Sequence, residues 1–395
     1  MSVSASTGEE LKLDWSIQED PERLAGFEAR VERGELVEAD DWMPHNYRVG
    51  MLRMAEHHAN SEIVGALPEG EWITRAPSLK RKLALIAKVQ DEVGHGQMLY
   101  RVSQDLGKPR DAMLRDLITG RTKYHNVFNY PAPTWADVAM IQWLVDGAAI
   151  MNQKSLADGS YGPYVRTMRR INMEEAFHFK SGEDMVLTLM SGTRHQKQMA
   201  QEAFDRWWGP CLMFFGPPDK DSTKTAPFMR WRIKTQTNDT LRQKFVNRFA
   251  PAAKDLGLVI KTPKRAGSGV PASELGTAAP GRAPSVPEAQ AGATASRGST
   301  CGTAAPGCDS TALGQVIRNP DGSPVLVPDE NIRPLGTNGD WGFTQPDWDE
   351  FYRVIRGHGP CNRERVGLRR FSYEQGAWVR RAILGQRAGL PPRRI

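Results

Sequence analysis

The sequence predicts an all-α protein, built as a four-helix bundle with additional helices and a C-terminal extension. Apolar residues recur at helical spacing from about residue 40 to residue 257, with only short interruptions. Capping residues precede several of these stretches, and Pro or Gly follows them. Two Glu-x-x-His motifs lie on different expected helices, as they do when facing helices of a bundle build one metal site.

The first two expected helices are bounded by clear start and stop signals. The first covers about residues 44–67 and is expected to end at Pro68, because proline interrupts helical hydrogen bonding. The second begins after Ser78, its N-cap, and ends at Gly107, which suits the position after a helix end.

Four more helices are expected in the same part of the chain. The third begins after Thr134, and Asp137 completes its capping box. The fourth covers about residues 164–190 and ends at Gly192. Two further helices are expected near residues 196–208 and 239–256.

Composition divides the chain into four regions. Residues 1–39 form a polar lead-in, and residues 40–260 form the bundle. Residues 261–315 are dominated by Ala, Gly, Pro, Ser and Thr, and are expected to be disordered because they cannot bury enough apolar surface. Residues 316–395 form a C-terminal extension, with turn signals for a small hairpin before residue 344 and closing helices near 345–356 and 362–384.

The bulk composition excludes several classes of protein. The chain of 395 residues has 52 basic and 46 acidic residues, a net charge of +6, which is mild at this length. A nucleic-acid partner is not expected, whereas an anionic small molecule or an acidic protein fits. No apolar run is long enough to span a membrane, and the four cysteines match no common zinc or iron–sulfur spacing, so we expect a cytoplasmic protein with reduced thiols.

Two Glu-x-x-His motifs carry the strongest chemical signal, Glu92 with His95 and Glu175 with His178. Residues three apart share one face of a helix, so each motif presents a carboxylate and an imidazole to one point. The same faces carry apolar side chains, which places both motifs toward the core. These apolar residues are Leu85, Val89, Leu99, Met168, Ile171 and Phe179.

These buried carboxylates require a compensating charge, because an unpaired buried carboxylate costs several kcal/mol. No Lys or Arg falls consistently on these faces, although Lys88 lies close to one of them. A metal is therefore the simplest compensation. Two further acids complete the set: Glu62, in a helix rich in small residues, and Asp146, in an otherwise apolar helix. One carboxylate from each of two helices, with Glu-x-x-His from each of two others, is the ligand set of di-iron and di-manganese bundles.

Two other interpretations of these residues stay open at this point. A buried polar network could satisfy the same side chains without a metal. Zinc is less favoured, because structural zinc prefers Cys and His, and catalytic zinc is one ion with three ligands. Six nitrogen and oxygen ligands, including four carboxylates able to bridge, suit iron or manganese.

The sequence resembles the catalytic subunits of the bacterial ring 1,2-phenylacetyl-CoA epoxidases, which are multicomponent di-iron monooxygenases. The matching motifs include NSEIVGALPEGEW, QDEVGHG, KYHNVFNYPAPTWADVAM, RINMEEAFHF, FGPPD and GPCNRERVGLRRFSYEQGAW, and the likeness covers about residues 38–260 and 340–385. Relative to that pattern, residues 263–312 look like an insertion. The resemblance implies a ferritin-like bundle with two iron ions, and six catalytic iron ligands: Glu62, Glu92, His95, Asp146, Glu175 and His178.

The resemblance also implies where a coenzyme A thioester would bind. Its phosphates call for basic side chains at the mouth of the site. His57 stands where the family often has Gln. The positions that match substrate contacts of the family are Arg53, His57, Lys123, Tyr124, His125, Asn126, Met213, Ser222, Thr223, Lys224, Lys234 and Asn362.

The reaction implied by this resemblance is epoxidation of the aromatic ring of phenylacetyl-CoA at C1–C2 with O2. The sequence has no Rossmann glycine fingerprint, flavin motif or cysteine-rich cluster, so electrons from NADPH are expected through a separate flavin and iron–sulfur reductase. Structural and bridging subunits of the complex are the other expected partners.

Two alternative functions remain. One is a non-catalytic ferritin-like scaffold or iron-storage protein, which the complete set of six ligands speaks against. The other is a di-iron oxygenase for a different aryl-CoA, such as benzoyl-CoA.

Overall fold

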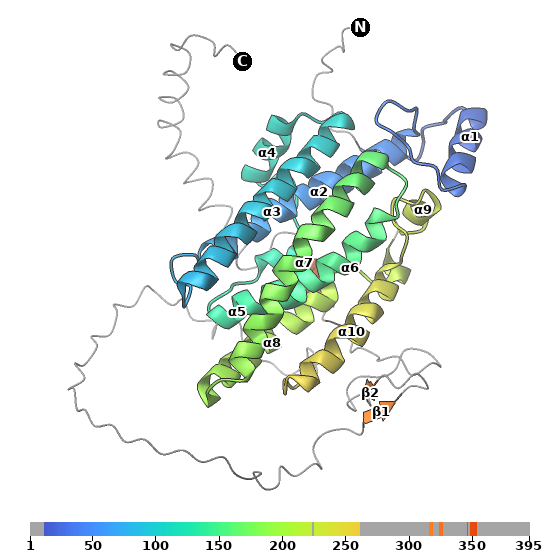
Figure 1. Ribbon diagram of the computed structural model, residues 1–395. Coiled ribbons are helices and arrows are strands. Elements are labelled where there is room, and N and C mark those ends of the chain that lie inside the picture. Colours follow the sequence, from blue (N-terminus) through green and yellow to red (C-terminus); the bar gives the residue numbers. More distant parts are fainter. Residues whose placement is uncertain are drawn as a thin grey trace, which may run out of the picture.

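Four long helical segments lie side by side and form a bundle (Figure 1). The computed structural model describes residues 12–222, 225–260, 316–318, 324–326, 346 and 348–353. The bundle segments are α2 (His45–Gly70), α3 (Leu79–Asp105), the run from α5 (Trp135–Met140) through the π-helix η2 (Ile141–Val145) to α6 (Asp146–Ala157), and α7 (Gly162–Met190). The predicted all-α class and four-helix bundle are therefore confirmed.

Shorter elements surround the bundle. Along the described part of the chain these are α1 (Pro21–Glu32), α4 (Arg110–Ile118), the 3-10 helices η1 (Asn126–Asn129) and η3 (Asp219–Asp221), α8 (Arg194–Met213), α9 (Thr225–Arg230), α10 (Asn238–Asp255) and α11 (Trp348–Arg353). Strands β1 (Val316–Arg318) and β2 (Pro324–Leu326) pair antiparallel, with Ile317 opposite Val325. The predicted insertion at 263–312 and the predicted helix at 362–384 lie outside the described residues.

The helix starts follow the capping signals of the sequence. Ser78 accepts a hydrogen bond from the Arg81 backbone N–H at the start of α3, and Thr134 and Asp137 form the predicted capping box of α5. The expected end at Pro68 is wrong, because α2 continues to Gly70. A proline in the last turn removes a single helical hydrogen bond, and the extra residues keep Glu69 on the inner face of the helix.

A π-helix interrupts the third bundle segment. Gly182 of α7 lies against this turn: a Cβ atom there would lie 2.4 Å from the Gln142 carbonyl carbon and 2.5 Å from the Trp143 nitrogen. The two backbones therefore touch. A π-turn inserts one extra residue, so the side chains on either side of it are rotated about the helix axis relative to a regular α-helix. With this rotation, Gln142 and Asp146 are both buried in the bundle.

The hydrophobic core consists of two clusters with a polar layer between them. On α3, Leu85 belongs to one cluster and Leu99 to the other, and on α7 the same holds for Met185 and Ile171. The Glu-x-x-His motifs lie between these residues on both helices. In the described ranges, no helix combines the length and apolar character needed to cross a lipid bilayer.

Candidate metal centre and substrate cavity

Six buried side chains converge at the middle of the bundle in two overlapping groups. The first group is Glu62, Glu92, His95 and Glu175, and the second is Glu92, Asp146, Glu175 and His178. Within each group, one ligand atom per residue lies within 4.8 Å of all the others. Because two carboxylates belong to both groups, the arrangement suits two neighbouring ions bridged by carboxylates. All six residues predicted as metal ligands are thus brought together.

The histidines present one nitrogen to this cluster and the other to a carboxylate outside it. His95 Nε2 lies 2.8 Å from Glu174, and His178 Nε2 lies 3.2 Å from Asp91. His95 Nδ1 points inward, is buried and has no hydrogen-bond partner. Outer carboxylates of this kind fix the tautomer and orientation of metal-binding imidazoles. The bare inward nitrogen and the four carboxylates fit a divalent metal.

The two imidazoles are strongly basic in this cluster. Burial lowers the pKa of His95, but the nearby Glu62 and Glu92 carboxylates outweigh burial and raise it to about 11. Burial and Lys88 lower the pKa of His178, but Glu175 and Glu92 raise it to about 9. The carboxylates of the cluster therefore favour added positive charge, either as a proton on each imidazole or as a metal ion between the side chains.

A lysine that was not expected on these faces lies inside the cluster. Lys88 is 2% exposed, and its Nζ lies 3.1 Å from Glu69 and 3.0 Å from Asp146, and also pairs with Glu92. The sequence placed Lys88 only close to one of these faces, whereas the structure places its ammonium among the carboxylates of the cluster. A lysine stem is long enough to carry the ammonium one turn along the helix, so the position of its Cα does not show where the charge lies.

Lys88 does not neutralise the cluster by itself. Burial lowers the pKa of Lys88, but Asp146, Glu69 and Glu92 raise it well above its ordinary value, so it is an ammonium. Its ammonium contacts Glu69, Glu92 and Asp146, and the two other predicted carboxylate ligands, Glu62 and Glu175, are buried as well. Burial raises the pKa of Asp146 well above its ordinary value. One ammonium does not balance this set of acids, so the remaining compensation comes from protons on the carboxylates and imidazoles or from a metal ion.

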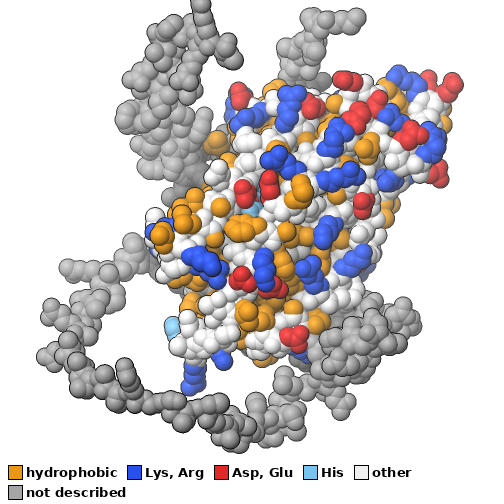
Figure 2. All heavy atoms as spheres, viewed as in Figure 1, with side chains coloured by type: hydrophobic (Ala, Val, Ile, Leu, Met, Phe, Trp, Pro, Cys, Tyr) orange, Lys and Arg blue, Asp and Glu red, His pale blue; other side chains and the backbone are white. Residues whose placement is uncertain are grey.

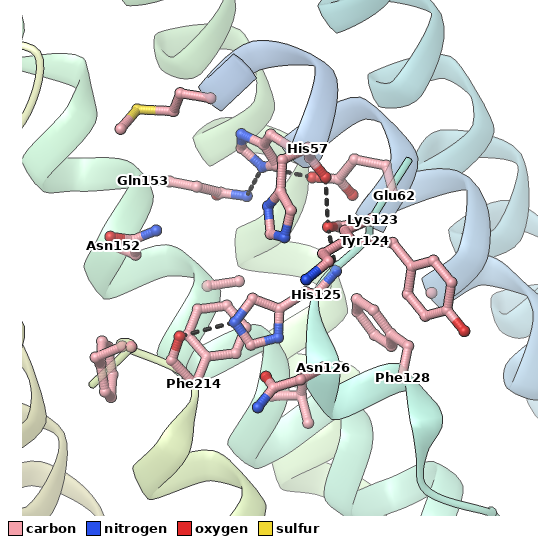
Figure 3. A pocket seen from close by; sticks show the side chains of 18 of the residues that line it. His57, Glu62, Lys123, Tyr124, His125, Asn126, Phe128, Asn152, Gln153 and Phe214 are labelled. Atoms are coloured by element: carbon pink, nitrogen blue, oxygen red, sulfur yellow. Dashed lines mark hydrogen bonds and ion pairs between the residues drawn. The ribbon is translucent and has the colours of Figure 1, made fainter. Parts of the chain in front are cut away.

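A cavity of about 720 Å³ connects this centre with the ends of several helices (Figure 3). Glu62, Glu92, Asp146 and Glu175 lie at one part of its wall. Eight of the predicted substrate contacts also line it: His57, Lys123, Tyr124, His125, Asn126, Met213, Ser222 and Lys234. Arg53 is not among the described residues of the wall, and Thr223, Lys224 and Asn362 lie outside the described part of the chain.

His125 organises one wall of the cavity. Its ring stacks on Phe214 with 4.0 Å between centroids, and its Nε2 lies 2.7 Å from the Phe214 carbonyl oxygen. Its Nδ1 accepts a hydrogen bond from the Val127 N–H, so Nε2 carries the proton and donates it to that carbonyl. Burial lowers the pKa of His125 to about 3, so the ring is neutral and acts as part of the wall.

Several polar residues of the cavity wall, including the following four, were not predicted from the sequence. Asn238 accepts a hydrogen bond from Lys234, four residues earlier, at the start of α10. Burial lowers the pKa of Lys234 to about 8. The spacing of Lys234 and Asn238 beside the helix start was a signal that could have identified the pair. The others are His58, Glu69 and Gln153.

Two comparisons relate this chain to known proteins. The model of a family described as phenylacetic acid catabolic protein matches residues 17–270. The chain is also 39% identical over 358 residues to a protein of Escherichia coli (strain K12) that is named as one of the subunits of 1,2-phenylacetyl-CoA epoxidase. The match covers 91% of this chain and 94% of that protein.

Proposed function

Because the chain belongs to the phenylacetic acid catabolic protein family, we propose that it is the catalytic oxygenase subunit of a di-iron phenylacetyl-CoA 1,2-epoxidase. The relative's name specifies the substrate and the epoxidation. The observation that carries the proposal is the pair of buried ligand groups sharing Glu92 and Glu175 beside a large cavity. A scaffold protein has no need for such a costly set of buried acids next to a cavity.

Each part of the cavity has a task in this proposal. The six converging residues would hold two iron ions, which supply the reductive activation of O2 that ring epoxidation needs. Lys123 and Lys234 would bind the anionic coenzyme A portion. The wall built by His125 and Phe214 would orient the acyl portion and limit the access of water to the centre.

Partner subunits and a reductase are part of the proposal. The E. coli relative is named as one component of an epoxidase, and the sequence of this chain carries no flavin motif or cysteine-rich cluster. Exposed apolar side chains on the outer faces of α3 and α7 support contact with other components of a complex. Figure 2 shows hydrophobic side chains between basic ones over this face. They include Leu79, Leu83, Ile86, Val93, Met173, Phe177 and Leu187.

A metal-loading and turnover experiment tests the proposal. The chain is loaded anaerobically with Fe²⁺, its iron content is measured, and epoxide formation from phenylacetyl-CoA is followed with O2, the partner subunits and the reductase. We expect about two iron ions per chain. Glu92→Ala should lose iron and activity, because Glu92 belongs to both groups, while Glu71→Ala on the surface should keep both. Full activity of Glu92→Ala would refute the ligand assignment.

A non-catalytic, metal-free scaffold is the second candidate, and Lys88 is the observation that favours it. An ammonium among buried carboxylates already satisfies part of their charge. Binding of less than one iron ion per chain under the same conditions would support this candidate.

Product analysis with benzoyl-CoA beside phenylacetyl-CoA separates the two aryl-CoA substrates.

A further inference from the structure

A histidine outside the predicted ligand set makes direct contact with one of the candidate ligands. His58 precedes Glu62 by one turn of α2, and its Nε2 lies 2.8 Å from Glu62 Oε1. The side chain of His58 is 16% exposed. Neither the family resemblance nor the two ligand groups assigned it a role.

The other nitrogen of His58 is held by a buried tyrosine. The hydroxyl of Tyr164, on α7, lies 2.8 Å from His58 Nδ1, and Tyr164 is 2% exposed. An ionised carboxylate can only accept hydrogen bonds, so the proton of a neutral imidazole must lie on Nε2, facing Glu62. Nδ1 is then an acceptor, and the Tyr164 hydroxyl donates to it. Glu62 therefore sets the tautomer of His58, and the Tyr164 hydroxyl holds the ring in the matching orientation.

The side chain of Gln153 lies beside the same nitrogen of His58 that faces Glu62. Its amide nitrogen lies 3.5 Å from His58 Nε2, and Gln153 is 1% exposed. With the His58 proton on Nε2, this contact is packing and not a hydrogen bond. Glu62 and Gln153 belong to different helices, α2 and α6. The ring is thus fixed by three helices, because His58, Gln153 and Tyr164 belong to α2, α6 and α7.

We propose that His58, oriented by Tyr164, is a positioning residue for Glu62, an inference that rests on the proposed di-iron function. Its hydrogen bond occupies Glu62 Oε1. The other oxygen, Oε2, faces the first ligand group and lies 3.9 Å from His95 Nδ1. The pair therefore selects which carboxylate oxygen is offered to the metal. Since Glu62 belongs only to the first group, the effect should be confined to one of the two ions.

Stepwise Co²⁺ titration of the full chain, followed by visible absorbance, tests this inference. Reference titrations of Glu62→Ala and Asp146→Ala identify the step that belongs to each group, because each residue occurs in one group only. We expect His58→Phe and Tyr164→Phe to weaken the Glu62 step by about 10–100-fold, the usual effect of losing a partner of a metal ligand. The other step should change by less than about twofold, which lies within ordinary context variation.

Two variants separate positioning from a loss of structure. His58→Gln keeps an amide N–H that can donate to Glu62, so it should recover most of the lost affinity. Tyr47→Phe is the matched control for Tyr164→Phe, because it also removes a buried hydroxyl, bonded to Ser160 at 2.8 Å, away from the cluster. Unchanged titrations in His58→Phe, or equal weakening of both steps, would overturn the inference. A wild-type chain that binds no Co²⁺ would instead overturn the proposed function beneath it.

Discussion

His95 Nε2 on α3 lies 2.8 Å from the Glu174 carboxylate on α7. The reverse contact also exists, because His178 on α7 lies 3.2 Å from Asp91 on α3. In both helices the outer carboxylate is the residue directly before the glutamate of the Glu-x-x-His motif. Each of the two helices therefore supplies a carboxylate that contacts the imidazole of the other helix. These two contacts fix both imidazoles from outside the candidate metal centre.

These two contacts predict that the outer carboxylates, Glu174 and Asp91, influence the affinity of the site for metal. Glu174→Ala should weaken metal binding by about 10–100-fold, because His95 loses the acceptor that fixes its orientation. Glu174→Gln should lose less, since an amide oxygen can still accept the imidazole proton. Isothermal titration with Co²⁺ measures both. Glu183→Ala, an exposed acid on the same helix paired with Lys180, is the control, and equal affinity in Glu174→Ala and the control would contradict the prediction.

The position of Lys88 predicts that this residue stabilises the metal-free chain and at the same time lowers the affinity of the chain for metal. Lys88→Met should destabilise the metal-free chain by about 3 kcal/mol, because it leaves buried carboxylates without their cation. Metal binding should then stabilise the variant more than the wild type, since Lys88 no longer competes for Glu92 and Asp146. Urea unfolding with and without Co²⁺ measures the free energy of unfolding in each state.

Lys108→Met is the matched control for this prediction. Lys108 also bridges two acids, Glu56 at 2.7 Å and Asp116 at 2.9 Å, but lies outside both ligand groups. Its replacement should reduce stability equally with and without Co²⁺. The prediction fails if Lys88→Met gains no more from Co²⁺ than Lys108→Met does.

The long helices and the ligand set could be predicted from the sequence because each depends on local spacing. Ser78 and the Thr134–Asp137 capping box mark helix starts through contacts three residues apart. The two Glu-x-x-His motifs need only a helix and an apolar face to be recognised. The helix starts are confirmed and the six predicted ligands converge, because local spacing is enough to specify both; their role as metal ligands stays a prediction.

The remaining features depend on contacts between distant segments. The π-turn at Ile141–Val145 is set by the close approach of Gly182, and a pattern of 3.6 residues per turn cannot show one extra residue. Asn238 is held at the cavity wall by contacts with a distant segment, because its backbone N–H donates to Asp219 and its side-chain amide donates to the Pro217 carbonyl oxygen. Likewise, the charge of Lys88 is placed by its side-chain conformation rather than by its position in the helix.

The contact of Gly182 with the π-helix predicts that a single methyl group there disturbs the metal centre. Gly182→Ala would place its Cβ within 2.4 Å of the Gln142 backbone, so η2 must move and Asp146 with it. We expect a loss of about 1–3 kcal/mol of stability, as for other overpacked sites. Binding of the metal ion that Asp146 and His178 would hold should weaken more than binding of the other ion.

Gly94 provides the control for this prediction. It lies between Glu92 and His95 on α3, yet a Cβ there would meet nothing within 4 Å. Gly94→Ala should therefore stabilise the chain by about 0.5–1 kcal/mol, the usual gain for alanine over glycine inside a helix. Thermal unfolding and Co²⁺ titration of both variants make the comparison. Equal behaviour of the two would show that the π-turn does not depend on Gly182.

Lys234 predicts how coenzyme A binding depends on pH. Burial lowers the pKa of Lys234 to about 8, so the side chain is an ammonium below that pH and a neutral amine above it. A phosphate favours the ammonium, and affinity for free coenzyme A should therefore fall by up to about tenfold between pH 7 and pH 9. Lys234→Arg stays charged throughout this range, so its profile should be flatter. Calorimetric titration with coenzyme A measures the profiles, and Lys220→Arg, at an exposed position, controls for the substitution itself. Parallel profiles for wild type and Lys234→Arg would exclude Lys234 as the titrating contact, because other groups would then account for the whole pH dependence.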